Sequence, residues 1–84
     1  MKYSVYILPN AERDCEGLPK NVYQLCRGKI IKLGVSPRPS GCKKLVGEDG
    51  FRIRVGDYRI LYRIDDANKK IFIYRVKHRK EVYR

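Results

Sequence analysis

The N-terminal third of the chain combines one β-branched and aromatic run with two stretches of helical periodicity. Residues 3–8 predict a strand, and Pro9 after it suits the first turn of a helix. Gly17 breaks this helix, and Pro19 begins a second helix that we expect to end at Gly34. Two apolar stripes at helical spacing predict packing on a sheet: Ala11, Cys15 and Leu18, then Val22, Cys26, Ile30 and Leu33.

The rest of the chain shows no helical period and predicts a meander of four strands. We expect these strands at residues 42–46, 51–55, 58–64 and 70–76, separated by turn-forming segments. The order is β-α-α-β-β-β-β, an α+β fold in which two N-terminal helices pack on a mainly antiparallel sheet. At 84 residues, we expect one domain spanning 1–84. Gly28 is unfavourable inside the second helix, and a close contact with another element is one explanation.

A two-residue hairpin loop at Gly56 and Asp57 would set the register of two neighbouring strands. Arg54 then lies opposite Arg59, and Arg52 shares the face of Arg54. Like charges directly opposite each other destabilise a sheet, and an anion bound between them would relieve that cost. The alternative is an ordinary solvated strand face.

The charge balance points to a polyanionic partner. Twenty Lys and Arg against nine Asp and Glu give a net charge of +11, more than solubility requires. Residues 1–42 carry 7 basic and 3 acidic side chains (net +4) and residues 43–84 carry 13 and 6 (net +7), so the predicted strands hold most of the excess. A generally basic surface without a specific ligand is the alternative.

The cysteines and the hydropathy pattern indicate a cytoplasmic protein. Cys15, Cys26 and Cys42 are odd in number and lack metal-ligand spacing, so we expect no disulfide framework, no metal and no cofactor. The N-terminus lacks the features of a secretion signal, and no apolar stretch approaches transmembrane length. We therefore expect no membrane association.

Two segments, GFRIRVGDYRILYRID and IFIYRVKHRKEVYR, resemble the C-terminal half of toxins of the RelE/ParE superfamily, most closely RelE-type mRNA interferases. Leu-Pro before the first helix and LxxSPRP after the second match more loosely. The resemblance implies the toxin component of a type II toxin-antitoxin system, which enters the ribosomal A site and cuts mRNA by attack of a 2′-hydroxyl on the adjacent phosphate. It also implies a cognate antitoxin protein as partner, with the ribosome and mRNA as targets.

The same resemblance suggests roles for individual residues. Arg59 matches the phosphate-binding arginine of the family, and Arg79 and Tyr83 match a C-terminal catalytic pair. Arg52 and Arg54 fall where ribosome-dependent members carry basic residues, often lysines, that contact RNA.

Proton transfer requires a different kind of group. Because arginine stays charged in proteins, neither Arg52 nor Arg54 can serve as general base, and the role moves to His78 or Tyr83. Lys43 and Lys44 are candidate contacts to the RNA backbone, which add affinity without sequence information.

Two other functions compete with the mRNA interferase. A ParE-type toxin shares the architecture but inhibits DNA gyrase and cuts no RNA. A non-catalytic RNA-binding module needs only the basic sheet and no general base. The arginine-bearing strands and the HRKEVY ending favour the RelE-type function.

Overall fold

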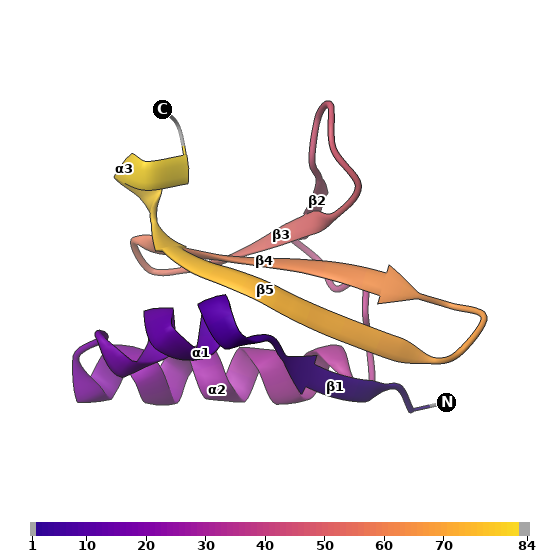
Figure 1. Cartoon of the computed structure of the whole chain (residues 1–84), viewed down its shortest axis with the longest axis horizontal. Coiled ribbons are helices and arrows are strands. Elements are labelled where there is room, and N and C mark those ends of the chain that lie inside the picture. The colour runs from indigo at the N-terminus through magenta and orange to yellow at the C-terminus, as the bar shows by residue number, and fades with distance from the viewer. Residues whose placement is uncertain (1, 83–84) are drawn as a thin grey trace.

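The computed structural model, which describes residues 2–82, is a five-stranded sheet with two helices against one face (Figure 1). The order β-α-α-β-β-β-β is confirmed, and a short helix follows the last strand. The elements are β1 (Ser4–Ile7), α1 (Pro9–Glu16), α2 (Lys20–Leu33), β2 (Lys43–Lys44), β3 (Phe51–Val55), β4 (Tyr58–Asp65), β5 (Lys70–His78) and α3 (Arg79–Val82).

The sheet has the strand order β1-β5-β4-β3-β2. β1 pairs with β5 in parallel, and the other three pairings are antiparallel, which confirms a mainly antiparallel sheet. The helices α1 and α2 lie on one side of this sheet, and α3 lies on the opposite side (Figure 1). We call the side of the sheet opposite α1 and α2 the open face.

Proline and glycine set the helix boundaries much as the sequence predicts. Pro9 begins α1, and Gly17 caps its C-terminus: the Gly17 N–H donates to the Asp14 carbonyl, and the Leu18 N–H donates to the Cys15 carbonyl. Pro19 precedes α2 as its N-cap, and Gly34 follows its last residue. A Cβ at Gly34 would lie 3.1 Å from the carbonyl oxygen of Tyr3, whose N–H donates to the Gly34 carbonyl at 2.6 Å. Gly34 thus lets the end of α2 approach the start of β1.

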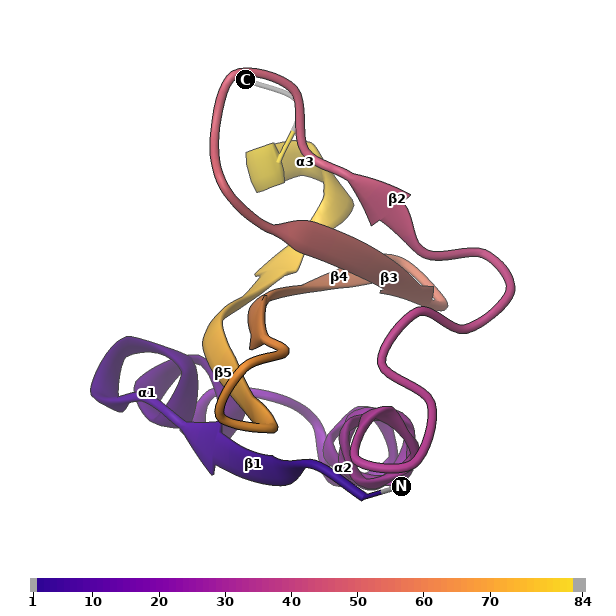
Figure 2. The same ribbon diagram turned by 90° about the vertical axis from the view of Figure 1, so that its right-hand side faces the viewer.

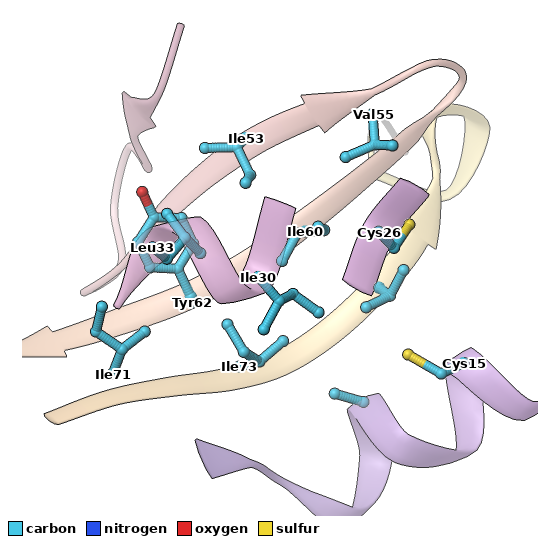
Figure 3. Close-up of a cluster of buried hydrophobic side chains, with 12 residues drawn as sticks. Cys15, Cys26, Ile30, Leu33, Ile53, Val55, Ile60, Tyr62, Ile71 and Ile73 are labelled. Atoms are coloured by element: carbon cyan, nitrogen blue, oxygen red, sulfur yellow. The ribbon is translucent and has the colours of Figure 1, made fainter. Parts of the chain in front are cut away.

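The core lies between α1, α2 and the sheet (Figure 3). Four of the five residues at the predicted stripe positions Ala11, Cys15, Cys26, Ile30 and Leu33 are less than 6% exposed, and Cys15 is 9% exposed. Leu18 and Val22 pack against this core while remaining partly exposed. The sheet contributes Ile53, Val55, Ile60, Tyr62, Ile71, Ile73 and Val76.

Two buried polar groups of the core are accounted for. The Tyr62 hydroxyl donates a 2.7 Å hydrogen bond to the Pro37 carbonyl, so the ring fills the core without an unsatisfied polar atom. Burial raises the pKa of the Cys26 thiol to about 11, which keeps it protonated and unreactive at neutral pH. Cys26 therefore serves packing rather than chemistry.

Three predicted strand bounds and the explanation offered for Gly28 were wrong. The strand expected at residues 42–46 shrinks to Lys43–Lys44, because the Leu45 N–H donates back to Gly50 and closes a loop. The first strand is shorter than predicted, and the last continues through His78. Gly28 is not explained by a close contact within the chain, since a Cβ there would meet nothing within 4 Å.

Candidate nucleic-acid interface

Two rows of mainly basic residues cross the open face of the sheet. In the first row Lys43 pairs with Arg52, Arg52 with Leu61, and Leu61 with Arg75. In the second row Arg59 pairs with Arg54 on one side and with Lys77 on the other. The predicted register, with Arg54 opposite Arg59 and Arg52 opposite Leu61, is confirmed. Since residues two apart on a strand share a face, both rows lie on the same side of the sheet.

A groove of about 580 Å³ lies over the first row. Its lining includes five cationic side chains and one carboxylate, that of Glu48, so it attracts anions. We call it the basic groove; its cationic residues are Lys43, Lys44, Arg52, Arg75 and Lys77. The structure thus brings Lys43, Lys44 and Arg52 together in the lining of one groove.

Arg75 and Lys77 are candidate site residues that sequence reasoning missed. A register shift between Leu61 and Tyr62 on β4 changes the alternation along β5, so that Ile71, Ile73 and then Val76 face the core. The odd spacing between Ile73 and Val76 is visible in the sequence, but it indicates a bulge only once the core positions are known.

Arg59 is the buried charge of the second row, with only 6% of its surface exposed. Its Nη1 donates to the Tyr58 carbonyl at 3.4 Å. Arg54, directly opposite, is exposed, and its Nε donates to the Gly56 carbonyl at 3.4 Å. A partly desolvated guanidinium interacts with a phosphate more strongly than a solvated one does, so Arg59 is well placed to bind an anion.

Asp14 of α1 fixes Arg75 at the edge of the basic groove. Its carboxylate accepts from Arg75 Nε at 2.9 Å and Nη2 at 3.2 Å, and from the Val76 N–H at 2.8 Å. Burial alone would raise the pKa of Asp14, but these hydrogen bonds and the Arg75 charge outweigh it and hold the pKa below its usual value. The carboxylate is therefore ionised at neutral pH and orients the guanidinium.

Arg79 is anchored at the end of the β3–β4 hairpin. Gly56 has φ 58°, as the first position of a type II′ loop requires, and Asp57 follows it. The Arg79 N–H donates to the Asp57 carbonyl at 2.7 Å, and Arg79 Nε lies 3.8 Å from Asp57 Oδ1 with both side chains exposed. The helix α3, which begins with Arg79, sits on the open face (Figure 1). Arg79 thus lies on the same side of the sheet as the basic rows.

His78 is the last residue of β5 and directly precedes Arg79. It pairs with Tyr58 across β4 and β5, and its ring meets the Tyr58 ring edge-on with centroids 5.2 Å apart. Because side chains alternate along β5, His78 faces the same side of the sheet as Val76, opposite to Lys77. Its Nδ1 accepts from the Lys80 N–H at 3.3 Å. The other candidate base, Tyr83, lies outside the described residues.

Residues 2–82 show no group of three or more His, Cys, Asp or Glu side chains arranged to hold a metal ion. Within the same residues, no helix is both long and apolar enough to cross a membrane.

Comparison with known proteins gives the class of this domain. Residues 5–83 match the family described as ParE toxin of type II toxin-antitoxin system, parDE. The curated toxin RelG of Mycobacterium tuberculosis is 34% identical over the whole chain and 99% of its own length. A basic α+β domain with these relatives is a toxin of a type II toxin-antitoxin system.

The solved structures similar to this chain include RelE-type toxins, alone or with their antitoxins. The RelBE2 toxin-antitoxin complex of Mycobacterium tuberculosis contains a chain 33% identical, with TM-score 0.83 over 93% of this chain and 99% of that one. The archaeal RelE-RelB complex from Pyrococcus horikoshii gives 32% identity and TM-score 0.83 over 94% and 97%. A mutant of the E. coli toxin RelE in the free state gives 26% and 0.80 over 99% and 92%. The chain belongs to the RelE/ParE toxin superfamily and resembles its RelE-type members.

Proposed function

We propose that this toxin is a ribosome-dependent endoribonuclease of the cytoplasm that cuts mRNA in the A site and so stops translation. The observation that carries the proposal is Arg59, a guanidinium buried in the sheet between Arg54 and Lys77. A buried guanidinium suits a phosphate that gains negative charge during a reaction, and the neighbouring cations add to its positive potential. The adjacent basic groove supplies a path for the RNA backbone.

The proposed reaction breaks one phosphodiester bond. The 2′-hydroxyl oxygen bonds to phosphorus, the bond from phosphorus to the 5′-oxygen breaks, and the products are a 2′,3′-cyclic phosphate and a 5′-hydroxyl. A general base takes the 2′ proton, and an acid gives a proton to the leaving oxygen. The pentacoordinate transition state carries more charge on its oxygens than the substrate does, so fixed arginines accelerate the step.

The roles divide between phosphate binding and proton transfer. Arg59 and Arg79 hold the scissile phosphate, while Arg52, Arg54, Lys43 and Lys44 bind the flanking backbone. Proton transfer belongs to Tyr83 or His78. The position of His78 on the other side of β5 from Lys77 favours Tyr83 for this role.

The test is induced expression without an antitoxin, followed by mapping of RNA ends. We expect growth arrest and mRNA breaks within translated codons. Purified toxin added to programmed ribosomes should cut the message in the A site and leave a cyclic phosphate. Intact messages on those ribosomes would contradict the proposal.

A second candidate is inhibition of DNA gyrase, because the matching family is described by its ParE members. The same expression experiment separates the two functions. Gyrase inhibition predicts DNA breaks or loss of supercoiling activity in a purified gyrase assay, with mRNA left intact. The basic groove and the buried Arg59 favour the nuclease.

A further inference from the structure

The end of the open face next to β1 carries two stacked aromatic side chains. Tyr6 of β1 pairs with Phe72 of β5, and their ring centroids lie 5.6 Å apart with 24° between the ring planes. Their chain neighbours Val5 and Ile73 pack on the core side, where Ile73 is fully buried. Because successive side chains on a strand face opposite sides of the sheet, both rings lie on the open face. We call Tyr6 and Phe72 the aromatic pair.

The aromatic pair is accessible, and a cation rests over it. Tyr6 is 44% exposed, and Phe72 is half-buried. Lys70 Nζ lies 5.7 Å from the centroid of the Tyr6 ring. A cation over an exposed ring contributes less binding free energy than a nucleobase stacked on that ring. A base can therefore take the place of the ammonium group, which the flexible lysine chain can bring to a phosphate instead.

A bulge in β5 connects the aromatic pair to the basic groove. The register between β4 and β5 skips Tyr74, which is therefore the extra residue of the bulge. Tyr74 and Arg75 both line the basic groove, and Phe72 lies on the same side of the sheet. Figure 2 shows β5 running from its place beside β1 to α3. The open face thus changes along one strand from aromatic, beside β1, to basic, toward α3.

Tyr74 is engaged by other side chains. The guanidinium carbon of Arg63 lies 4.7 Å from the centroid of its ring. The Tyr74 hydroxyl donates to Oε1 of Glu48 at 3.3 Å. The ring surface available for stacking at this end of the open face is therefore that of the aromatic pair.

We propose that Tyr6 and Phe72 stack on bases of the single-stranded RNA whose backbone occupies the basic groove. The proposal rests on the chain being an RNA-binding nuclease, as proposed above. Sites for single strands combine a cationic groove, which holds the phosphates, with aromatic rings, which hold the bases. The aromatic pair continues the basic groove along the same strand, so one RNA strand can contact both.

The aromatic pair adds affinity and takes no part in the reaction. Phe72 lies roughly 16 Å along β5 from Lys77, the partner of Arg59. The stacked bases are therefore different from the nucleotide at the scissile phosphate. Because every base has a π-face, this contact should favour no particular sequence.

The experiment compares two RNA strands that carry the same phosphates. One is a 2′-O-methyl RNA of mixed sequence, and the other has abasic sugars in place of its nucleotides. Wild-type toxin should bind the strand with bases about tenfold more tightly, because stacking depends on the bases and backbone contacts do not. Equal affinity of the wild type for the two strands would overturn the proposal.

Tyr6→Ala and Tyr23→Ala form a matched pair. Both residues are exposed to a similar degree (44% and 41%), but Tyr23 lies on α2, on the other side of the sheet (Figure 1). Tyr6→Ala should raise the Kd for the strand with bases about tenfold and leave the Kd for the abasic strand within about twofold. Tyr23→Ala should leave both values unchanged. Equal losses on both strands in Tyr6→Ala would show that the aromatic pair only stabilises the pairing of β1 with β5, and would overturn the proposal.

Two milder substitutions separate stacking from folding. Tyr6→Phe keeps the ring and should keep the affinity, whereas Phe72→Leu keeps an apolar side chain without a π-face and should lose affinity for the strand with bases. Neither removes a phosphate contact, so the dependence of log K on log salt should keep its slope. Thermal unfolding of each variant checks that the domain is folded at the temperature of the titration. Parent affinity for the strand with bases in Phe72→Leu would contradict stacking on this ring.

Failure of the proposed nuclease would look different from failure at the aromatic pair. Cleavage by the wild type on programmed ribosomes judges the nuclease by itself. At saturating toxin, Tyr6→Ala should cut at the parent rate in a single turnover, because the pair contributes binding alone. A hundredfold slower cut under these conditions would place Tyr6 in the reaction and overturn the proposal.

Discussion

Asp14 and Arg75 form a two-point ion pair that joins α1 to the edge of the basic groove, with distances of 2.9 and 3.2 Å. The same carboxylate accepts the Val76 N–H on β5, beyond the segment Lys70–Ile73 that pairs with β1. Asp14 therefore accepts a backbone N–H at the edge of the sheet and also neutralises part of the positive charge that would bind RNA. Removing the carboxylate should therefore lower the stability of the domain and raise its affinity for RNA.

Asp14→Asn should destabilise the domain while strengthening its binding to RNA. We expect a loss of about 1–2 kcal/mol, since the pair is charge-assisted but Arg75 is about one-third exposed and screened by solvent. Affinity for single-stranded RNA at low salt should rise a few-fold, because Arg75 is released. Thermal unfolding and RNA titration measure the two changes. Glu16→Gln, an exposed change on the same helix, is the control.

The destabilisation in Asp14→Asn should depend on pH. The pKa of Asp14 is lowered in the folded state, so its stabilising effect is complete above the ordinary aspartate pKa of about 3.9. It disappears as the pH falls through the lower folded-state pKa. The Tm difference between wild type and variant should be constant near neutrality and vanish in acid. A difference that grows in acid would contradict this account.

Arg59→Ala should reduce single-turnover cleavage by about tenfold to a hundredfold, matching the loss of about 1.5–3 kcal/mol for a charge-assisted phosphate contact. Arg59→Lys should recover only part of the rate, because a lysine keeps the charge but not the planar two-point geometry. Arg63→Ala is the control, as Arg63 is exposed on the same strand and stacks on Tyr74. Equal rates for Arg59→Ala and Arg63→Ala would remove Arg59 from the phosphate site.

The basic groove should contribute affinity through the RNA backbone. Lys43→Gln and Arg52→Gln should each flatten the dependence of log K on log salt by about 0.7, the value for one phosphate contact in a single strand. Lys20→Gln, an exposed change at the start of α2, should leave the slope unchanged. Titrating a 2′-O-methyl RNA, which cannot be cut by 2′-hydroxyl attack, measures binding alone. Unchanged slopes in both groove variants would place the RNA elsewhere.

The sequence predicted the parts of the site that local chemistry determines. A two-residue loop at Gly56 and Asp57 has only one register, so the pairing of Arg54 with Arg59 followed directly. The bulge opposite Leu61 and Tyr62 depends on how two distant strands fit, so Arg75 and Lys77 were missed. The contact between Asp14 and Arg75, 61 residues apart, has no local signal either.

The final prediction concerns proton transfer, where His78 and Tyr83 are the two candidates. His78→Gln keeps an acceptor near the Lys80 N–H and should preserve the end of β5, while Tyr83→Phe removes only a hydroxyl. Both variants should bind ribosomes like the parent. The variant lacking the general base should cut about a hundredfold more slowly or worse in single-turnover assays, the usual size of such a contribution. Because His78 faces the same side of the sheet as Val76, opposite to Lys77, we expect Tyr83→Phe to lose more of the cleavage rate than His78→Gln. Parent rates in both variants would show that arginines and ribosomal groups supply the catalysis, and a wild-type chain that binds without cutting would be an RNA-binding module.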